Sequence, residues 1–534
     1  MTEPADLPGI LAERASATPG TVAYEFVCPG HSVKALTYGE LWQRAAGMAT
    51  SILRYHDGAH EPTVILYPPG LEYVVAVYAC FLAGVPAVPA YPPDPGRPEA
   101  SRARLTRIMR DLGTPTVLAD DAAAGVVRTY GGRVLTQRAD DRPRAGLPLP
   151  AAGDIALIQY TSGSSSAPRG VVVRHGNLRH NMRAIARRMH VDRTSRAMMW
   201  LPPYHDMGLI GGILTPVFVG FPVRLMAPFD FLKRPLEWLR QISDFRATVS
   251  GGPNFAYDLC VRRHAREGGV SRADLSCWEV AFNGAEPVRT RTMEAFARTF
   301  ASAGFDQRAF FPCYGLAEAT LLVSGEHWDG RPADGLGRVS CGSSVPGQTV
   351  TVAHPETGEP LADGTEGEIW VSGPSVTDGY WDGTDGHFAE LDGRRFLRTG
   401  DTGYLSGGRL VVTGRTKDVL VHCGANYHAA DIEMAAVADD PGLRQVAAAF
   451  MAEREDDTEI VVVVETRGGD GSAVKTAAAV RRRVLAASGL AVNTVVVAPA
   501  GTVPRTSSGK IQRPSCRARY LAGEYDDLRP LRQA

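Results

Sequence analysis

The segment from Tyr160 to Gly170 combines small residues, hydroxyl side chains and one basic residue, and it reads Y-T-S-G-S-S-S-A-P-R-G. Small residues let backbone N–H groups approach an anion, hydroxyls donate hydrogen bonds, and the cation of Arg169 offsets negative charge. An apolar run, Ile155–Ile158, precedes the segment, and a helix-like pattern begins after Asn177. The pattern indicates a phosphate-binding loop between a strand and a helix, with a flexible connector as the competing interpretation. It does not match the G-x-x-x-x-G-K-[ST] loop of other nucleotide enzymes.

Four further motifs follow this loop in order along the chain. They are Y-G-L-A-E-A-T at 314–320, R-T-G-D-T-G at 398–403, G-R-T-K-D at 414–418 and P-R-T-S-S-G-K-I-Q-R at 504–513. With the loop, they resemble the ordered signature of adenylate-forming enzymes, which include acyl- and aryl-CoA synthetases, luciferases and adenylation domains. The resemblance implies that the chain uses ATP to convert a carboxylic acid into its acyl-AMP, releasing pyrophosphate.

Four other segments are similar to fatty acyl-AMP ligases in particular. They read Y-P-P-D-P at 91–95, L-P-P-Y-H-D-M-G-L-I-G-G at 201–212, S-G-G-P-N-F-A-Y-D-L-C at 250–260 and N-G-A-E-P at 283–287. This likeness extends from about Leu7 to Tyr525. It implies a fatty acid substrate and transfer of the acyl group to the phosphopantetheine thiol of an acyl carrier protein. An acyl-CoA synthetase, which uses CoA as acceptor, and a non-catalytic homologue stay open as alternatives.

The first half of this chemistry joins two anions, so it needs cations and hydrogen-bond donors rather than a side-chain nucleophile. Lys510 ends a loop of small residues, 506–509, and the resemblance implies that it bridges the substrate carboxylate and the α-phosphate. Glu318 would bind Mg²⁺, for which a carboxylate oxygen is a suitable ligand. Asp401 and Arg415 would hold the ribose hydroxyls. A solvated lysine and a turn aspartate are the ordinary structural interpretations of Lys510 and Asp401.

The resemblance also assigns residues to the nucleotide and to the acyl chain. With Lys510 and Glu318, His205 completes the expected catalytic set, near the acyl carboxylate. The expected ATP and AMP contacts are Thr161, Ser162, Gly163, Ser164, Arg169, Ala285, Glu286, Tyr314, Gly315, Thr320, Asp401 and Arg415. The expected acyl pocket comprises His205, Met207, Gly208, Gly211, Gly212, Asn254 and Phe255. A lone histidine and glycines that permit close packing are the structural alternatives.

Three segments depart from the fatty acyl-AMP ligase pattern. In the phosphate loop the family usually has Thr-Gly where this chain has Ser165 and Ser166, and Lys where it has Arg169. The stretch Leu321–Arg338 has 18 residues, which is short for the insertion that is thought to disfavour CoA in that family. The segment Cys423–Glu433, which contributes to the thiol-transfer face, also differs. These departures leave the acceptor open between a carrier protein and CoA.

Composition excludes several classes of protein. The 534 residues carry a formal net charge of -1, so the chain has no excess of positive charge that would favour binding to nucleic acid or to an anionic membrane. The eight cysteines form no C-x-x-C pair, which favours reduced thiols over a disulfide framework or a zinc site. The N-terminus lacks the features of a signal peptide. The apolar run Leu71–Ala90 is interrupted by glycine and proline, which favours a buried helix that ends near Gly84, followed by a short strand. We therefore expect a soluble cytoplasmic protein without stable membrane insertion.

Helical patterns alternate with short runs rich in Val, Ile and Leu from about residue 20 to 410, which predicts an α/β fold with largely buried sheets. The expected strands are Pro62–Leu66, Pro115–Leu118, Ile155–Ile158, Val223–Met226, Glu279–Phe282 and Gly367–Val371. After the polar segment 414–418 the pattern changes. There the expected strands are Gln445–Met451, Glu459–Glu465 and Val492–Val497, and the expected amphipathic helix is Ala473–Ser488.

The domain organisation expected from these patterns has two parts. A large N-terminal adenylating domain, 1–413, would consist of α/β subdomains and bind ATP and the acyl substrate. A small mobile α+β domain, 419–534, would carry Lys510. The segment 414–418 would join them, with Lys417 at the hinge position of the family. The resemblance implies that the small domain changes its orientation between adenylation and thiol transfer, through a few backbone dihedral angles at the hinge.

Overall fold

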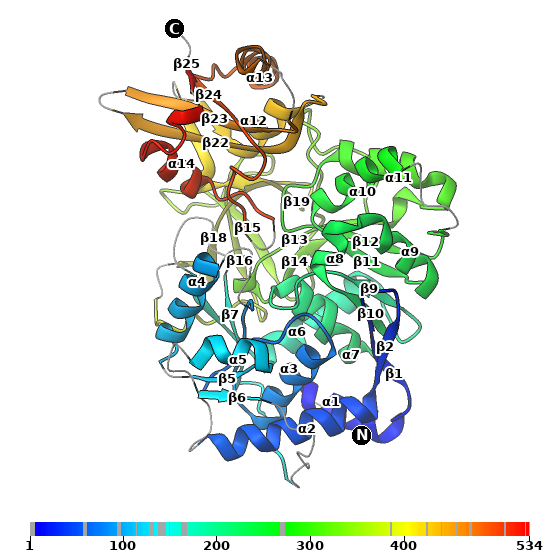
Figure 1. The fold of residues 1–534 in the computed structure, drawn as a ribbon. Helices are drawn as coiled ribbons and strands as arrows, with labels where there is room; N and C mark the ends of the chain where they lie inside the picture. The colour runs from blue at the N-terminus through cyan, green and yellow to red at the C-terminus, as the bar shows by residue number, and fades with distance from the viewer. Residues whose placement is uncertain are drawn as a thin grey trace.

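We describe the fold from a computed structural model. It describes residues 6–56, 61–92, 98–113, 115–128, 133–136, 146–148, 150–161, 168–267, 273–384, 387–422, 425–438, 440–454, 457–468, 472–506, 509–528 and 530–532. Figure 1 shows most of the N-terminal part as two large sheets with helices packed around them, and the C-terminal part as a smaller unit at the top.

The first large sheet has the strand order β14-β13-β12-β11-β9-β10-β1-β2 among the described residues. Its inner strands pair in parallel, and only the edge pairs β1–β2 and β13–β14 are antiparallel. Parallel strands buried on both faces are expected for such apolar runs. The bounds are β1 Val22–Val27, β2 Val33–Thr37, β9 Ala197–Met199, β10 Val223–Met226, β11 Val249–Gly252, β12 Val280–Asn283, β13 Phe310–Gly315 and β14 Leu322–Gly325.

The second large sheet has the order β6-β5-β3-β4-β7-β8. Here only β7 and β8, which flank the Ser-rich loop, pair antiparallel. The loop therefore connects the ends of two adjacent antiparallel strands, and the following helix starts directly after β8. The bounds are β3 Thr63–Ile65, β4 Ala87–Pro89, β5 Thr116–Leu118, β6 Arg133–Leu135, β7 Ile155–Tyr160 and β8 Gly170–Arg174.

Helices of the N-terminal part cover and separate these sheets. They are α1 Leu7–Ala17, α2 Tyr38–Tyr55, α3 Leu71–Ala83, α4 Pro98–Asp111, α5 Asp121–Arg128, α6 His175–Arg188, a π-helix Met207–Leu214, α7 Thr215–Val219, α8 Pro228–Lys233, α9 Pro235–Phe245, α10 Asn254–Glu267 and α11 Thr290–Phe300. Every residue of α3 from Tyr73 to Ala83 is buried, and Gly84 ends the helix with φ 68°. This confirms the buried helix followed by a short strand. Among the described residues, no helix combines the length and apolarity needed to cross a bilayer.

A third, antiparallel sheet leads to the C-terminal part. It consists of β15 Thr349–Ala353, β16 Gly367–Ser372, β17 Phe388–Leu391, β18 Arg394–Ser406 and β19 Arg409–Arg415. A single 3₁₀ turn, Thr416–Asp418, follows β19. All six strands expected before this point are present, within one to two residues of their predicted bounds.

The C-terminal part has a four-stranded sheet, β22-β23-β24-β25, and a separate hairpin, β20-β21. Two apolar clusters consist entirely of residues between Leu420 and Leu531, so this part has cores of its own. The expected helix is present as α13 with unchanged bounds, and the three expected strands correspond to β22, β23 and β24. The bounds are β20 Val419–His422, β21 Ala425–His428, α12 Ala429–Val437, β22 Leu443–Arg454, β23 Asp457–Thr466, α13 Ala473–Ser488, β24 Thr494–Ala498, α14 Arg513–Leu521 and β25 Leu531–Arg532.

Candidate active site

A cavity of about 550 Å³ lies where β7, β13, the π-helix and the third sheet meet the loop that carries Lys510. Its wall has a group of polar residues and a group of apolar residues, which we call its polar end and its apolar end. The polar end includes Tyr160, Thr161, Arg169, Glu318, Tyr380, Arg415, Lys417 and Lys510. A site of this shape can hold a charged molecule against an apolar one.

Asp401 joins two of the predicted nucleotide contacts. The register of β18 and β19 sets Asp401 opposite Arg415, and Arg415 Nε lies 2.8 Å from Asp401 Oδ1. The hydroxyl of Tyr314, at the end of β13, donates to Asp401 Oδ2 at 2.7 Å. Burial and the neighbouring Asp401 carboxylate raise the pKa of Tyr314, so this hydroxyl stays protonated. A carboxylate oriented in this way keeps free lone pairs with which to accept from ligand hydroxyls.

Glu318 faces the cavity from a 3₁₀ turn, Ala317–Ala319. The hydroxyl of Tyr380 donates to Glu318 Oε1 at 3.2 Å. The guanidinium of Arg169 lies over the Tyr380 ring, 4.1 Å from its centroid, which is a favourable cation–π geometry. Burial raises the pKa of Glu318, while the Tyr380 hydrogen bond opposes this. The cation at the end of the Ser-rich loop and the Glu318 carboxylate therefore share one wall of the cavity.

Lys510 reaches the centre of the site from the C-terminal part. Its loop is closed by hydrogen bonds between Thr506 and Lys510. Burial and the nearby Arg415 lower the pKa of the Lys510 ammonium, while the carboxylates of Asp206 and Asp401 oppose this. A buried ammonium between carboxylates is held in place and keeps donors for an anionic ligand.

Asp206 pairs with His205, and its charge also acts on Lys510. Asp206 Oδ1 lies 2.5 Å from His205 Nδ1 and accepts from the Met207 backbone N–H at 2.7 Å. Burial alone would raise the pKa of Asp206, but His205 and Lys510 together hold it below its usual value. The Asp206 carboxylate is thus ionised, and it orients the His205 ring at the start of the π-helix.

The segment 283–287 forms the wall beside Tyr314. Ala285 has a left-handed backbone conformation, φ 67°, and lines the cavity. Gly284 has no room for a side chain, because a Cβ there would lie 2.8 Å from the Cys313 carbonyl oxygen. Glu286 accepts a hydrogen bond from the Phe255 backbone N–H, and burial, together with the nearby Asp258, raises its pKa to about 7. The segment is therefore held tightly against β13 and the start of α10.

The π-helix forms part of the apolar end of the cavity. π-helical turns are rare, but they are frequent at functional sites. Of its glycines, only Gly211 lines the cavity, opposite Leu321. A Cβ at Gly208 would lie 2.1 Å from the Pro202 carbonyl oxygen, and one at Gly212 would contact Met199. The other apolar wall residues include Ile185, Met189, Val191, Met199, Met207, Phe221, Val249, Phe282, Leu321 and Leu322.

A second hollow, a crevice of about 870 Å³, separates α10 from the C-terminal part and meets the cavity at Lys510. Its outer rim is strongly basic, with Arg262, Arg263, Arg266, Arg444 and Arg467. The crevice opens the reaction centre to solvent between the two parts of the chain.

The family model for AMP-binding enzymes matches residues 11–381. The chain belongs to the AMP-binding enzyme family. This confirms the resemblance drawn from the motifs, and the chain is an ATP-dependent enzyme that forms an acyl-adenylate.

Relatives of this AMP-binding enzyme match over nearly its whole length. The medium-chain-fatty-acid–[acyl-carrier-protein] ligase JamA of Moorena producens is 35% identical and covers 94% of this chain and 93% of its own. The putative fatty-acid–CoA ligase fadD25 of Mycobacterium tuberculosis is 32% identical, with 98% of both chains covered. A solved structure from a study of fatty acyl-adenylate ligases of E. coli and L. pneumophila is 32% identical, covers 98% of this chain and 99% of its own, and has a TM-score of 0.87. This confirms the predicted α/β fold class.

Most of the predicted site residues of this AMP-binding enzyme line the cavity or the crevice. They are Thr161, Arg169, His205, Met207, Gly211, Asn254, Phe255, Ala285, Glu286, Tyr314, Gly315, Glu318, Asp401, Arg415, Lys417 and Lys510. Gly208, Gly212 and Thr320 are not part of either wall, and the Thr320 hydroxyl donates to the Ser375 carbonyl instead. Ser162, Gly163 and Ser164 lie outside the described residues, as do Ser165 and Ser166.

Asp206, Tyr380 and Arg104 are polar wall residues for which the sequence analysis predicted no role. Asp206 lies inside the motif at 201–212, next to the predicted His205, but the motif predicted no role for it. Tyr380 is far from every motif, and the sequence carries no signal for its contact with Glu318. Arg104 lines the cavity from α4, and burial lowers the pKa of its guanidinium. The acid next to a predicted histidine could have been foreseen, whereas the other two depend on the fold.

Proposed function

We propose that this enzyme activates a fatty acid as its acyl-AMP and then transfers the acyl group to the phosphopantetheine thiol of an acyl carrier protein. The observation that supports it most is the similarity to JamA, named as a ligase of medium-chain fatty acids and acyl carrier protein, over 94% of this chain. The apolar end of the cavity suits an alkyl chain, and the polar end suits a nucleotide. A cytoplasmic location is part of the proposal, since the seven described cysteines are free thiols.

In the first step, a carboxylate oxygen of the acid attacks the α-phosphorus of ATP, and the bond from this phosphorus to pyrophosphate breaks. We infer that Lys510 donates to both reacting groups and offsets the charge that develops between them. Asp206 orients the His205 ring, and its negative charge acts on the Lys510 ammonium. Asp401 and Arg415 hold the ribose, and Tyr314 and Ala285 border the adenine.

Mg²⁺ fits this arrangement. Glu318 offers a carboxylate to the cavity beside Arg169. The described residues contain no cluster of three metal-ligating side chains, which suits an ion that takes its other ligands from ATP phosphates and water. When bound, Mg²⁺ would neutralise charge on the phosphates, and Glu318 would hold it on the same wall as Arg169.

In the second step, the thiol attacks the acyl carbonyl, a thioester forms and AMP leaves. We infer that residues 419–534 move as a small domain about the segment 414–418, with Lys417 at the hinge and 1–413 as the adenylating domain. The separate cores on either side of this segment support that division. Lys510 would leave the site in this step, so it would serve adenylation only.

CoA as acceptor is the second candidate. The 18-residue stretch from Leu321 to Arg338 and the similarity to fadD25, named a fatty-acid–CoA ligase, favour it. The two acceptors share the phosphopantetheine arm, so the reaction centre alone does not distinguish them.

A two-stage assay tests the proposal. The protein is incubated with ATP, Mg²⁺ and straight-chain acids, and acid-dependent pyrophosphate exchange is followed. CoA or a phosphopantetheinylated carrier protein is then added, and the thioester is identified by mass spectrometry. We expect exchange with fatty acids and thioester on the carrier. Exchange with no acid would refute adenylation, and thioester on CoA alone would establish the second candidate.

A further inference from the structure

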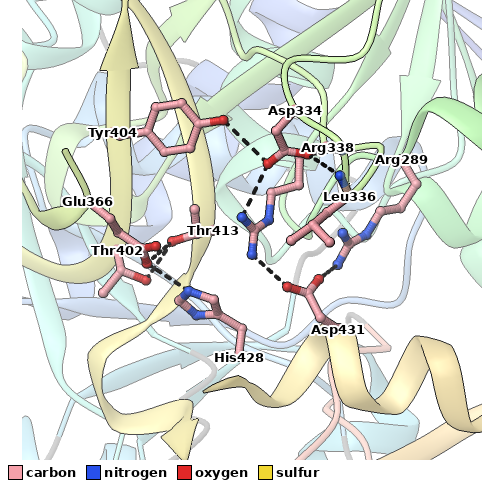
Figure 2. Close-up of polar contacts among 10 residues, drawn as sticks. All are labelled: Arg289, Asp334, Leu336, Arg338, Glu366, Thr402, Tyr404, Thr413, His428 and Asp431. Carbon is pink, nitrogen blue, oxygen red and sulfur yellow. Dashed lines mark hydrogen bonds and ion pairs between the residues drawn. The ribbon is translucent and has the colours of Figure 1, made fainter. Parts of the chain in front are cut away.

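One carboxylate of the C-terminal part lies between two arginines of the N-terminal part (Figure 2). Asp431, in the first turn of α12, accepts from Arg289 Nη2 at 2.7 Å through Oδ1 and from Arg338 Nη2 at 2.6 Å through Oδ2. The side chains of Arg289 and Arg338 are only 8% and 9% exposed, and that of Asp431 is 18% exposed. Partly buried, charge-assisted contacts of this kind are stronger than exposed ion pairs.

Asp431 is the carboxylate that pairs with both arginines in the described part of the chain. Arg338 also pairs with Asp334, at 3.2 Å, and Asp334 accepts from the Tyr404 hydroxyl. Glu286 and Glu366 of the N-terminal part also lie near Arg289 and Arg338, whereas Asp431 pairs directly with both arginines. Arg289 Nη1 and Arg338 Nε are buried without a hydrogen-bond partner in the described part of the chain. Because Asp431 pairs with both of these largely buried guanidinium groups, the contact favours the orientation in which Asp431 is present.

Asp431 is rigidly connected to Lys510. Two residues after Asp431 on α12, the buried Glu433 forms a two-pronged ion pair with Arg513, with both N–O distances 2.7 Å. Arg513 begins α14, three residues after Lys510. On the other side of the contact, Arg289 follows closely after Ala285 and Glu286, which line the site. The chain of contacts from Arg289 through Asp431, Glu433 and Arg513 therefore connects the wall of the site to Lys510.

Across the same interface, Glu366 of the N-terminal part also pairs with His428 of the C-terminal part at 2.7 Å, but the crevice beside α10 repels. Arg262 and Arg266 on α10 face Arg444 and Arg467 of the C-terminal part across the crevice. Burial lowers the pKa of the Arg262 guanidinium, and Arg467, Arg266 and Arg444 act in the same direction. Like charges at an interface disfavour the orientation that brings them together. The closed orientation therefore needs attractive contacts elsewhere, and the pairing of Asp431 with Arg289 and Arg338 is the one between fully charged side chains.

We propose that Asp431 is a positioning residue for adenylation: by pairing with Arg289 and Arg338 it holds the C-terminal part in the orientation that brings Lys510 into the site. The inference rests on the proposed function only through its first half-reaction. Asp431 touches no reacting atom, so it acts through Lys510. In thiol transfer, for which Lys510 leaves, the pairing has no role.

The test compares Asp431→Asn with the wild-type enzyme in both half-reactions. We expect acid-dependent pyrophosphate exchange to fall on the order of tenfold, because one charge of a partly buried pair is lost. Thioester formation from preformed acyl-AMP should stay within about twofold, since adenylation is bypassed. Asp431→Glu should restore most of the exchange. Asp431→Asn should cause no further loss in a Lys510→Ala background, because the two residues act as a unit.

Asp440→Asn is the matched control. Asp440 lies in the same C-terminal part and pairs with Arg483 of that part at 3.0 Å, so its loss should leave both half-reactions unchanged. Arg338→Gln is a second variant that leaves the C-terminal part intact. It should also reduce pyrophosphate exchange while sparing thioester formation from preformed acyl-AMP. Equal losses in both half-reactions, or unchanged exchange in Asp431→Asn, would overturn the proposal. Wild-type protein that shows no exchange with any acid would instead refute the proposed function.

Discussion

The two ends of the catalytic cavity are built in different ways. At the polar end, charged groups hold one another, as Asp401 holds Arg415 and Tyr314, and Asp206 holds His205. At the apolar end, uncharged side chains from α6, β9, the π-helix and β11 form the surface. The polar end therefore depends on residue type at a few positions, whereas the apolar end depends on shape.

The largest expected effect is at the polar end. Lys510→Ala should reduce acid-dependent pyrophosphate exchange on the order of a hundredfold or more, because a donor aimed at developing charge is lost. The factor should be the same for hexanoic and dodecanoic acid, since Lys510 does not contact the alkyl chain. Thioester formation from preformed acyl-AMP should be spared.

Lys475→Ala is the control for this variant, since Lys475 is exposed on α13 of the same C-terminal part. A Lys510→Ala loss that grows with chain length would contradict the separation of the two ends. A loss of thiol transfer as large as the loss of exchange would contradict the restriction of Lys510 to adenylation.

An intermediate effect is expected at the apolar end. Gly211→Val should reduce exchange with dodecanoic acid on the order of tenfold and leave hexanoic acid nearly unchanged, because added methyl groups occupy space that a longer chain needs. A Cβ at Gly211 would lie 3.3 Å from Leu321 Cδ2, so Gly211→Ala should show the same trend more weakly. The measurement is kcat/KM for exchange across a series of straight-chain acids.

Gly125→Ala is the matched control, because Gly125 lies on the exposed side of α5 and a Cβ there would meet no atom within 4 Å. Its chain-length profile should equal that of the wild type. Equal losses for short and long acids in Gly211→Val would mean that Gly211 supports the fold rather than the acyl site.

The same contrast explains what could be predicted from the sequence. Lys510, Asp401, Arg415 and Glu318 lie in compact motifs whose residue types carry the chemistry, and the structure brings them to the cavity and to the crevice that meets it. Alternating apolar runs predicted the strands well, since buried parallel strands need little else. The π-helix was not predicted, because glycine spacing gives no signal for an i→i+5 turn.

Residues that depend on long-range packing were also beyond prediction. Tyr380 contacts Glu318 across 62 positions of the sequence, and Met189, Val191 and Phe221 reach the apolar end from separate elements. Gly208 was assigned to the acyl pocket, yet its close approach to Pro202 is what excludes a side chain there. Apolar residues are common, so only their positions in space distinguish a pocket wall from a core.

The smallest expected effect is on stability, at Glu286, which lines the crevice beside the polar end. Burial raises the pKa of Glu286 to about 7, from an ordinary value of 4.5, so the folded chain binds this proton more tightly than the unfolded chain. The resulting stabilisation is fully present below the unfolded pKa and is lost as pH rises through about 7. Glu286→Gln keeps an acceptor for the Phe255 N–H and removes the titration. The difference in Tm, variant minus wild type, should therefore increase by a few degrees between the two pKa values.

Glu390→Gln, at an exposed position on β17, should show no such increase, and neither should Gly211→Val, whose site carries no charge. A pH-independent difference for Glu286→Gln would mean that the polar end holds this carboxylate without an electrostatic cost, and the contrast between the two ends would then rest on geometry alone.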